Sequence, residues 1–324
     1  MAPAVAGDVV VIGSCEGTIH GLDKERGESH WSYDTRVDGT AAQFHGEALL
    51  RDGIVFIGAD GPPRAHLYAL EAATGNLAWK RPFPHGVPTR VLGFDGSLAF
   101  VTGDGVLVSA DPKDGSTRWQ FEPEGTIPGR QRISAASMGE SVVFHAADGD
   151  VHVFDASSGK EQLRIPIGTP PSADPVVGGG RIYVATESGH VIRIDGRSGD
   201  VVAKKRLNGR IYGSLQSDGE RIFALVAGDA RETLVALDPL LEAAVWEQAA
   251  EAWSSFRPLV RGGVITVGGS NLVCSFRTED GEAVDCVPID GTVRGIGHDE
   301  RRLFIGTVAG KVVALPLLET EPAR

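Results

Sequence analysis

The chain has 324 residues, 43 glycines, 18 prolines and a formal net charge of −12 at pH 7. A surface of that sign repels phosphate backbones and anionic lipid, which argues against nucleic acid and membrane surfaces as partners. No apolar stretch is long enough to span a bilayer, and the first residues show no signal peptide. We therefore expect a cytoplasmic location for the chain as it stands, or an extracytoplasmic one if a leader has been removed.

The first kind of predicted element is a hairpin of two short apolar strands. Each hairpin is broken by Asp-Gly, Gly-Gly or a similar pair, which is a strong hairpin signal. Eight copies follow one another along the chain, over residues 3–13, 47–58, 90–103, 134–146, 174–186, 213–226, 257–269 and 294–308.

The second kind of element follows each hairpin. It consists of a third strand, a turn that usually begins with Asp and contains Gly, and a fourth strand. The first turn position is filled in order by Asp23, Glu71, Asp111, Asp155, Asp195, Asp238, Arg277 and Pro316. Successive differences are 48, 40, 44, 40, 43, 39 and 39 residues, which is the period of a four-stranded propeller blade.

These elements predict an all-β fold, an eight-bladed β-propeller of four-stranded antiparallel blades. We expect one domain over residues 1–324 and a monomer. The last copy lacks an obvious fourth strand. Either residues 317–324 supply it or the N-terminus lends a strand, and a seven-bladed propeller is the fallback.

Two recurring residue types have structural explanations. Four copies carry a tryptophan at the start of the fourth strand, which we interpret as packing between blades: Trp31, Trp79, Trp119 and Trp246. An aspartate at the first turn position can accept backbone N–H bonds two residues on. We therefore interpret these aspartates as turn formers and not as catalytic groups.

The run ALEAATGNLAW and the segment PVVGGGRIYVATESGHV resemble the pyrroloquinoline-quinone-type propeller repeat. This resemblance covers essentially the whole chain and implies a propeller, but fold alone does not imply function. Families with this repeat include quinone-dependent dehydrogenases, an eight-bladed lipoprotein scaffold of bacterial outer-membrane assembly, sensor domains of bacterial kinases, and small proteins of specialised metabolism.

The outer-membrane assembly scaffold is the better match among these groups, because it is similar in length and blade count. The quinone-dependent dehydrogenases are about twice as long, and the resemblance implies a calcium held by Glu and Asn and often a disulfide of adjacent cysteines. This chain has no adjacent cysteines, and its three asparagines (Asn76, Asn208 and Asn271) lie in or beside turns. We predict no cofactor and no metal.

A candidate site comes from comparing equivalent positions at the start of each blade. The position six residues before the first turn glycine carries Arg90, Arg257 and Arg294, with Glu47 and Asp174 in two other blades. The loops that lead into the blades add Arg130, Gln131, Arg132, Arg210, Tyr212 and Trp253. Guanidinium groups suit carboxylate or phosphate ligands, so these residues predict an anion-binding channel mouth. Alternatively, each arginine pairs with a neighbouring acid and closes the ring of blades.

Histidines and cysteines add three further hypotheses. His45 and His85, both in loops between blades, are the acid–base candidates, with a structural role as the alternative. Cys274 and Cys286 lie on either side of the TEDGE turn and could form a disulfide across the hairpin, which would favour an oxidising compartment. The alternative is that they are ordinary small buried residues.

No nucleophile elbow, P-loop or dinucleotide fingerprint is present in the sequence. We therefore expect a non-catalytic binding or scaffold protein that holds a protein, a peptide or a small anionic ligand at the channel mouth. The principal rival is a small enzyme, such as a cyclase or isomerase, that acts on an anionic metabolite in the same funnel. A quinone-dependent dehydrogenase is disfavoured.

Overall fold

The computed structural model describes residues 1–38, 42–60, 65–125, 133–229, 231–250, 253 and 257–319. Strands dominate this part of the chain, and its one helical element is the 3₁₀ turn η1 (Thr35–Asp38). The chain divides into two compact units. Unit 1 comprises Met1–Asp148, Val153–Gln162 and Gly297–Asp299, and unit 2 comprises Gly149–His152, Leu163–Ile296 and Glu300–Arg324.

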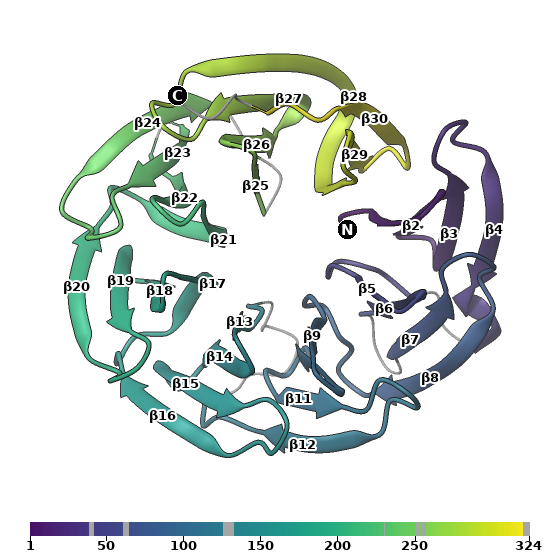
Figure 1. Cartoon of the computed structure of the whole chain (residues 1–324), viewed down its shortest axis with the longest axis horizontal. Helices are drawn as coiled ribbons and strands as arrows, with labels where there is room; N and C mark the ends of the chain where they lie inside the picture. The colour runs from purple at the N-terminus through teal and green to yellow at the C-terminus, as the bar shows by residue number, and fades with distance from the viewer. Residues whose placement is uncertain are drawn as a thin grey trace. The chain divides into compact units, whose positions relative to one another are not determined.

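Repeats one to four each form a four-stranded antiparallel sheet in which strands that are consecutive in sequence are neighbours (Figure 1). Their strands are β1 (Ala4–Ala6), β2 (Val9–Gly13), β3 (Thr18–Asp23), β4 (Ser29–Asp34), β5 (Leu49–Arg51), β6 (Ile54–Gly58), β7 (Ala65–Glu71), β8 (Leu77–Phe83), β9 (Leu92–Phe94), β10 (Ser97–Val101), β11 (Leu107–Ala110), β12 (Thr117–Phe121), β13 (Ala136–Met138), β14 (Ser141–His145), β15 (Asp150–Asp155) and β16 (Glu161–Pro166).

Repeats five and six share an eight-stranded sheet, in which one parallel pair, Asp174 and Ser214, joins two four-stranded halves. Repeats seven and eight share a six-stranded sheet. The strands are β17 (Pro171–Gly178), β18 (Arg181–Thr186), β19 (His190–Asp195), β20 (Val201–Arg206), β21 (Arg210–Ser217), β22 (Ile222–Ala227), β23 (Glu232–Leu237), β24 (Ala244–Ala250), β25 (Leu259–Arg261), β26 (Val264–Gly268), β27 (Ser270–Arg277), β28 (Ala283–His298), β29 (Arg302–Thr307) and β30 (Val312–Pro316).

The predicted hairpin turns are present. Between β5 and β6, Asp52 and Gly53 both have positive φ, 51° and 75°. This is the type I′ geometry that an Asp-Gly pair favours, because its twist matches that of the strands. The second strand of each hairpin is the most buried; in β10, for example, all five residues are buried. The core of each repeat therefore lies around its second and third strands.

The aspartates at the first turn position act as turn formers, as the sequence predicts. Asp23 Oδ1 accepts the backbone N–H groups of Glu25 at 2.9 Å and of Arg26 at 2.7 Å. Asp155 has the same role, with the hydroxyls of Ser158 and Ser157 as further donors. These bonds hold the pKa of the Asp155 carboxyl at about 2, below its usual value of 3.8.

The four tryptophans pack between repeats, again as predicted. Each indole Nε1–H donates to the carbonyl of the residue that follows the first turn position of the next repeat. The pairs and distances are Trp31 with Ala72 (3.0 Å), Trp79 with Pro112 (2.9 Å), Trp119 with Ala156 (2.9 Å) and Trp246 with Thr278 (2.9 Å).

The end of the chain differs from the prediction in one respect. The expected fourth strand of repeat seven and first strand of repeat eight form one continuous strand, β28. The connection stays extended because it keeps pairing with β27, at Ser270 and Thr292, and because Asn271 Oδ1 accepts the N–H of Gly291. Residues 320–324 of the predicted closing segment lie outside the described residues. The blade count of eight and the single domain therefore stay predictions.

Candidate functional site

In unit 1, the residue at the predicted arginine position is Arg90, and it contacts the neighbouring repeat. Arg90 precedes β9, and its guanidinium donates to the carbonyl of Ala135 from Nη2 at 2.7 Å and from Nε at 3.1 Å. Its backbone N–H donates to Ser134 Oγ, and the N–H of Val91 donates to the carbonyl of Glu47. The equivalent positions Glu47, Arg90 and Ser134 are therefore neighbours on successive repeats, and Arg90 links two of them.

In unit 2, the structure brings together two of the predicted aromatic residues. Tyr212, on β21, donates its hydroxyl to Glu232 Oε2 at 2.8 Å and to the carbonyl of Trp253 at 3.2 Å. The backbone N–H of Trp253 donates to the same Glu232 oxygen at 2.5 Å. One carboxylate therefore holds both aromatic residues, and we call Tyr212, Glu232 and Trp253 the Tyr212 cluster.

The electrostatics of the Tyr212 cluster keep the tyrosine protonated. Burial raises the pKa of Tyr212, the Glu232 carboxylate raises it further, and Arg210 lowers it by a smaller amount. The hydroxyl is therefore protonated at neutral pH and donates hydrogen bonds. Trp253 is 5% exposed, packs edge-on against Phe276, and its indole Nε1 has no partner within the described part of the chain.

The other predicted residues of unit 2 lie around this cluster. Trp253 pairs with Gly269, whose carbonyl accepts the N–H of Val293, the residue before Arg294. Arg210 and Arg294 are exposed, and Arg257 is half-buried just before β25. Asp174 pairs with Ser214 on the adjacent first strand. Arg132, with Arg130 and Gln131, lies outside the described residues.

Sequence reasoning missed Glu232, although a signal was present. The position six residues before the first turn position carries a glycine of positive φ in five repeats: Gly17, Gly105, Gly149, Gly189 and Gly310. Repeat six has Glu232 there. A carboxylate in place of a turn glycine marks a departure from the repeat and could have been read from the alignment of the copies.

The two histidine candidates each face an aspartate within unit 1. His45 Nδ1 lies 2.7 Å from Asp60 Oδ2, and the segment before His45 pairs with Asp60 through Gln43. His85 Nε2 lies 3.6 Å from Asp104 Oδ2. A carboxylate fixes the orientation of an imidazole, which is the arrangement of an acid–base pair and equally of a structural contact.

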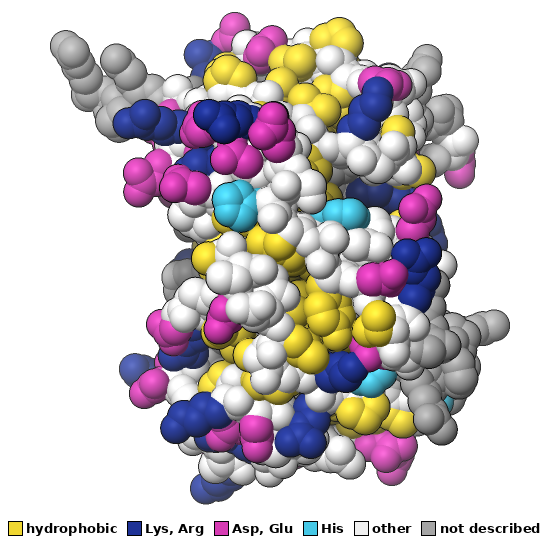
Figure 2. Space-filling view, turned by 90° about the vertical axis from the view of Figure 1, so that its right-hand side faces the viewer, with side chains coloured by type: hydrophobic (Ala, Val, Ile, Leu, Met, Phe, Trp, Pro, Cys, Tyr) yellow, Lys and Arg dark blue, Asp and Glu magenta, His cyan; other side chains and the backbone are white. Residues whose placement is uncertain are grey.

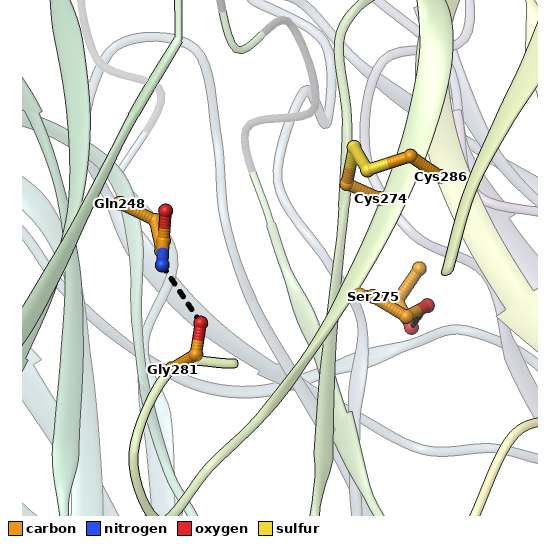
Figure 3. Close-up of a disulfide and its surroundings, with 6 residues drawn as sticks. Gln248, Cys274, Ser275, Gly281 and Cys286 are labelled. Carbon is orange, nitrogen blue, oxygen red and sulfur yellow. Dashed lines mark hydrogen bonds between the residues drawn. A yellow bond between two sulfur atoms is a disulfide. The ribbon is translucent and has the colours of Figure 1, made fainter. Parts of the chain in front are cut away.

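The structure joins Cys274 and Cys286 in a disulfide between β27 and β28 (Figure 3). The two residues are directly opposed in the strand register, with Cα atoms 4.1 Å apart. Cys274 is buried and Cys286 is exposed, so one side of the bond faces solvent. Nearby, Gln248 Nε2 donates to the carbonyl of Gly281 in the turn between the two strands.

The described residues were also compared with the requirements of a membrane span and of a metal site. No helix there is long and apolar enough to cross a membrane. Among the same residues, no group of three or more His, Cys, Asp or Glu could hold a metal ion. On the face in Figure 2, acidic and basic side chains are interspersed.

Comparison with known proteins identifies the type of repeat. A family model described as "Outer membrane protein assembly factor BamB" matches residues 16–176 and 168–315. The outer membrane protein assembly factor BamB of Yersinia pestis is 24% identical over 319 residues, covering 90% of this chain and 77% of that protein. The serine/threonine-protein kinase AfsK of Streptomyces griseus is 29% identical over 183 residues, covering 53% of this chain and 22% of the kinase.

Among solved structures, the crystal structure of BamB from Moraxella catarrhalis is similar, with a TM-score of 0.79 and 18% identity. The match covers 97% of this chain and 96% of that one. The fold is therefore a β-propeller built from four-stranded antiparallel blades.

Proposed function

The chain belongs to the family of the outer membrane protein assembly factor BamB, and we propose that it is a non-catalytic scaffold that binds another protein or a peptide. The observation that carries this proposal is the family match, which runs through nearly all the repeats. The contacts of the described residues agree with it. The Tyr212 hydroxyl and the Arg90 guanidinium are both held by hydrogen bonds within the protein.

We place the binding surface on unit 2, around the Tyr212 cluster. Arg210 and Arg294 are exposed there, and Arg257 lies half-buried before β25. Arginine is one of the residues that most often dominate protein interfaces. Guanidinium groups recognise carboxylates through two parallel hydrogen bonds, so the bound segment is expected to present acidic side chains.

A site-specific cross-linking experiment tests this proposal. A photoreactive amino acid replaces Arg210 or Arg294 in turn, and the protein is illuminated in its native cell. Lys113, exposed in a turn of unit 1, serves as the control position. We expect one and the same protein to be cross-linked from Arg210 and Arg294 and not from Lys113. Equal cross-linking from all three positions, or none from any, would contradict the proposal.

The disulfide bears on where this binding takes place. A bond between Cys274 and Cys286 persists in an oxidising compartment. We therefore favour an extracytoplasmic location. Alkylation of free thiols in intact cells, before and after reduction, tests it: Cys15 alone should react before reduction, and a reactive Cys286 at that stage would contradict it.

A small enzyme acting on an anionic metabolite is the second candidate, and the His45–Asp60 pair is the observation in its favour. An enzyme needs a titratable group within hydrogen-bond reach of its ligand. A thermal-shift screen of anionic metabolites against the protein and its His45→Gln variant separates the two functions. A metabolite that stabilises only the unsubstituted protein would favour the enzyme.

A further inference from the structure

The outer strand of repeat five, β20, ends the eight-stranded sheet, so one of its edges is not paired with another strand of that sheet. Its sequence is VVAKKR, and four of its six side chains are exposed: Val201, Val202, Lys204 and Arg206. An unpaired strand edge presents backbone N–H and C=O groups that can pair with another chain. In an acidic protein, this edge is basic.

The two faces of β20 have different environments. Ala203 packs against the hydrophobic cluster that repeats five and six share, and Lys205 Nζ donates to the carbonyl of Glu242 at 2.6 Å. Lys204 and Arg206 alternate with these residues and so lie on the other face. Their partners across the β19–β20 ladder are Ile192 and His190. Lys204 and Arg206 therefore share one face and are both exposed.

These two cations differ from those of the other outer strands. Among β4, β8, β12, β16 and β24, every lysine or arginine has an acidic partner. The pairs are Lys80 with Asp38, Arg81 with Asp114, Arg118 with Asp111 and Arg164 with Asp150. The side chains of Lys204 and Arg206 make no ion pair or hydrogen bond within the described residues, and the same holds for the side chain of Arg210.

His190, which lies across the ladder from Arg206, is in the positive field of these two side chains. The pKa of His190 is lowered, first by burial and then by Lys204 and Arg206. Carboxylates placed beside this ladder would offset that positive field.

We propose that β20 is the docking edge for an extended acidic segment of a partner protein. The segment adds as a strand to the free edge, and its carboxylates pair with Lys204 and Arg206. Backbone hydrogen bonds supply the affinity in this mode of recognition, and side chains at alternate positions supply the specificity. This inference rests on the proposed function, because it names the partner chemistry of a protein-binding scaffold.

Charges on an edge strand also have a protective role, since lysines discourage edge-to-edge aggregation. That role and docking make different predictions. If the cations only protect the edge, their removal leads to self-association and leaves the affinity for an acidic strand unchanged. If the cations dock a partner, their reversal weakens binding of the acidic strand.

Fluorescence anisotropy measures the binding directly. The probe is a labelled ten-residue peptide of alternating valine and glutamate with blocked termini. Lysine replaces glutamate in a second peptide, and a third is N-methylated at every second residue to remove strand hydrogen bonds. We expect the glutamate peptide to bind, the lysine peptide not to bind, and the N-methylated peptide to bind at least about tenfold more weakly.

The matched variants are Lys204→Glu/Arg206→Glu and Lys113→Glu/Lys160→Glu, which change the net charge equally. Lys113 and Lys160 lie in exposed turns of unit 1. The first pair is expected to weaken peptide binding by about tenfold, whereas the second leaves it unchanged. A folded β20 variant with unchanged affinity overturns the proposal, and so does full binding by the N-methylated peptide.

Two further outcomes are decisive. Binding to phosphatidylglycerol vesicles without binding to the peptide would make the patch a membrane contact and overturn the proposal. Cross-linking from Arg294 separates this inference from the function it rests on. If that cross-link forms while the peptide fails to bind, only the docking edge is wrong; if both are absent, the scaffold itself is wrong.

Discussion

The repeats with a tryptophan and those without one are held to their neighbours in different ways. Where Trp31, Trp79, Trp119 or Trp246 is present, an indole donates to the next repeat and its ring covers the turn there. Repeat five has Ala203 at the same position. The equivalent carbonyl, of Pro239, instead accepts the Tyr183 hydroxyl at 2.9 Å and Arg193 Nη1 at 3.1 Å.

The difference extends to the turn that each tryptophan covers. A Cβ added to Gly75 would lie 2.5 Å from the ring of Trp31, and the glycines covered by the other three tryptophans are equally close to theirs. In repeat six, which follows Ala203, this glycine is replaced by Glu242. The turn glycine is nevertheless retained where no tryptophan covers it, as at Gly199, which lies against Leu163 and Ile165 of repeat four. Two departures from the repeat therefore lie side by side: Ala203 is in β20, and Glu242 is in the turn whose carbonyl accepts a hydrogen bond from Lys205 of the same strand.

Removing a tryptophan is expected to have the largest effect. Trp79→Ala should lower the free energy of unfolding by about 3–5 kcal/mol, because it removes the ring that packs on Phe56 and the bond to Pro112. Urea denaturation measures this loss. Trp79→Phe keeps part of the packing and should lose less. A loss below about 1 kcal/mol for the alanine variant would show that the indole does not hold the repeats together.

The turn glycine gives the next largest effect, with a matched control. Gly75 and Gly27 occupy the same turn position with φ of 74° and 69°, but nothing lies within 4 Å of a Cβ at Gly27. Gly27→Ala should cost about 1 kcal/mol, for backbone strain alone. Gly75→Ala should cost about 3 kcal/mol, because the Trp31 ring must also move. Urea denaturation measures both losses. If the two variants lose the same free energy of unfolding, the Trp31 ring does not constrain Gly75.

Repeat seven, which also lacks a tryptophan, carries the disulfide instead. Replacing both Cys274 and Cys286 by serine should lower the free energy of unfolding by about 2–3 kcal/mol, since the bond closes a short loop in the unfolded chain. Denaturation with and without a reductant measures the same quantity on the unsubstituted protein. A midpoint that reduction leaves unchanged would show that the bond does not stabilise repeat seven.

The substitute contacts of repeat five are expected to contribute less. Tyr183→Phe removes one of the two donors to Pro239 and leaves Arg193 in place. We expect a loss of about 1 kcal/mol in the free energy of unfolding. Phe44, buried in unit 1, provides a matched aromatic site at which Phe44→Leu tests packing alone. No loss on Tyr183→Phe would mean that Arg193 alone satisfies the carbonyl.

The turn aspartates occur in repeats of both kinds and are expected to have the smallest individual effects. The bonds from Ser158 and Ser157 lower the pKa of Asp155 in the folded protein to about 2. The stabilisation is therefore complete above the unfolded value of 3.8 and is lost as pH falls from about 4 to about 2. Asp155→Asn should reduce this part of the acid-induced loss of stability. An unchanged acid profile would contradict the assignment.

The sequence was sufficient to predict the strands, the turn aspartates and the tryptophan contacts, because these features recur at similar intervals along the chain. It was not sufficient for β28, where the chain stays paired across a segment that resembles a loop. Glu232 was not predicted, because it lies neither at the position six residues before the first turn glycine nor in a loop that leads into a blade, and instead replaces a turn glycine at the start of β23. The basic residues of β20 can be predicted from the run VVAKKR. The absence of ion pairs to Lys204 and Arg206 cannot, because it depends on which turns lie opposite the strand in the fold.

One measurement on two folded variants tests the central claim, that the regular contacts hold the fold and the irregular surface binds the partner. Urea stability and affinity for the valine–glutamate peptide are measured for Trp79→Phe and for Lys204→Glu/Arg206→Glu. The first variant should lose stability and keep its affinity, whereas the second should lose about tenfold in affinity and keep its stability. The reverse pattern, or loss of both quantities in both variants, would contradict the claim.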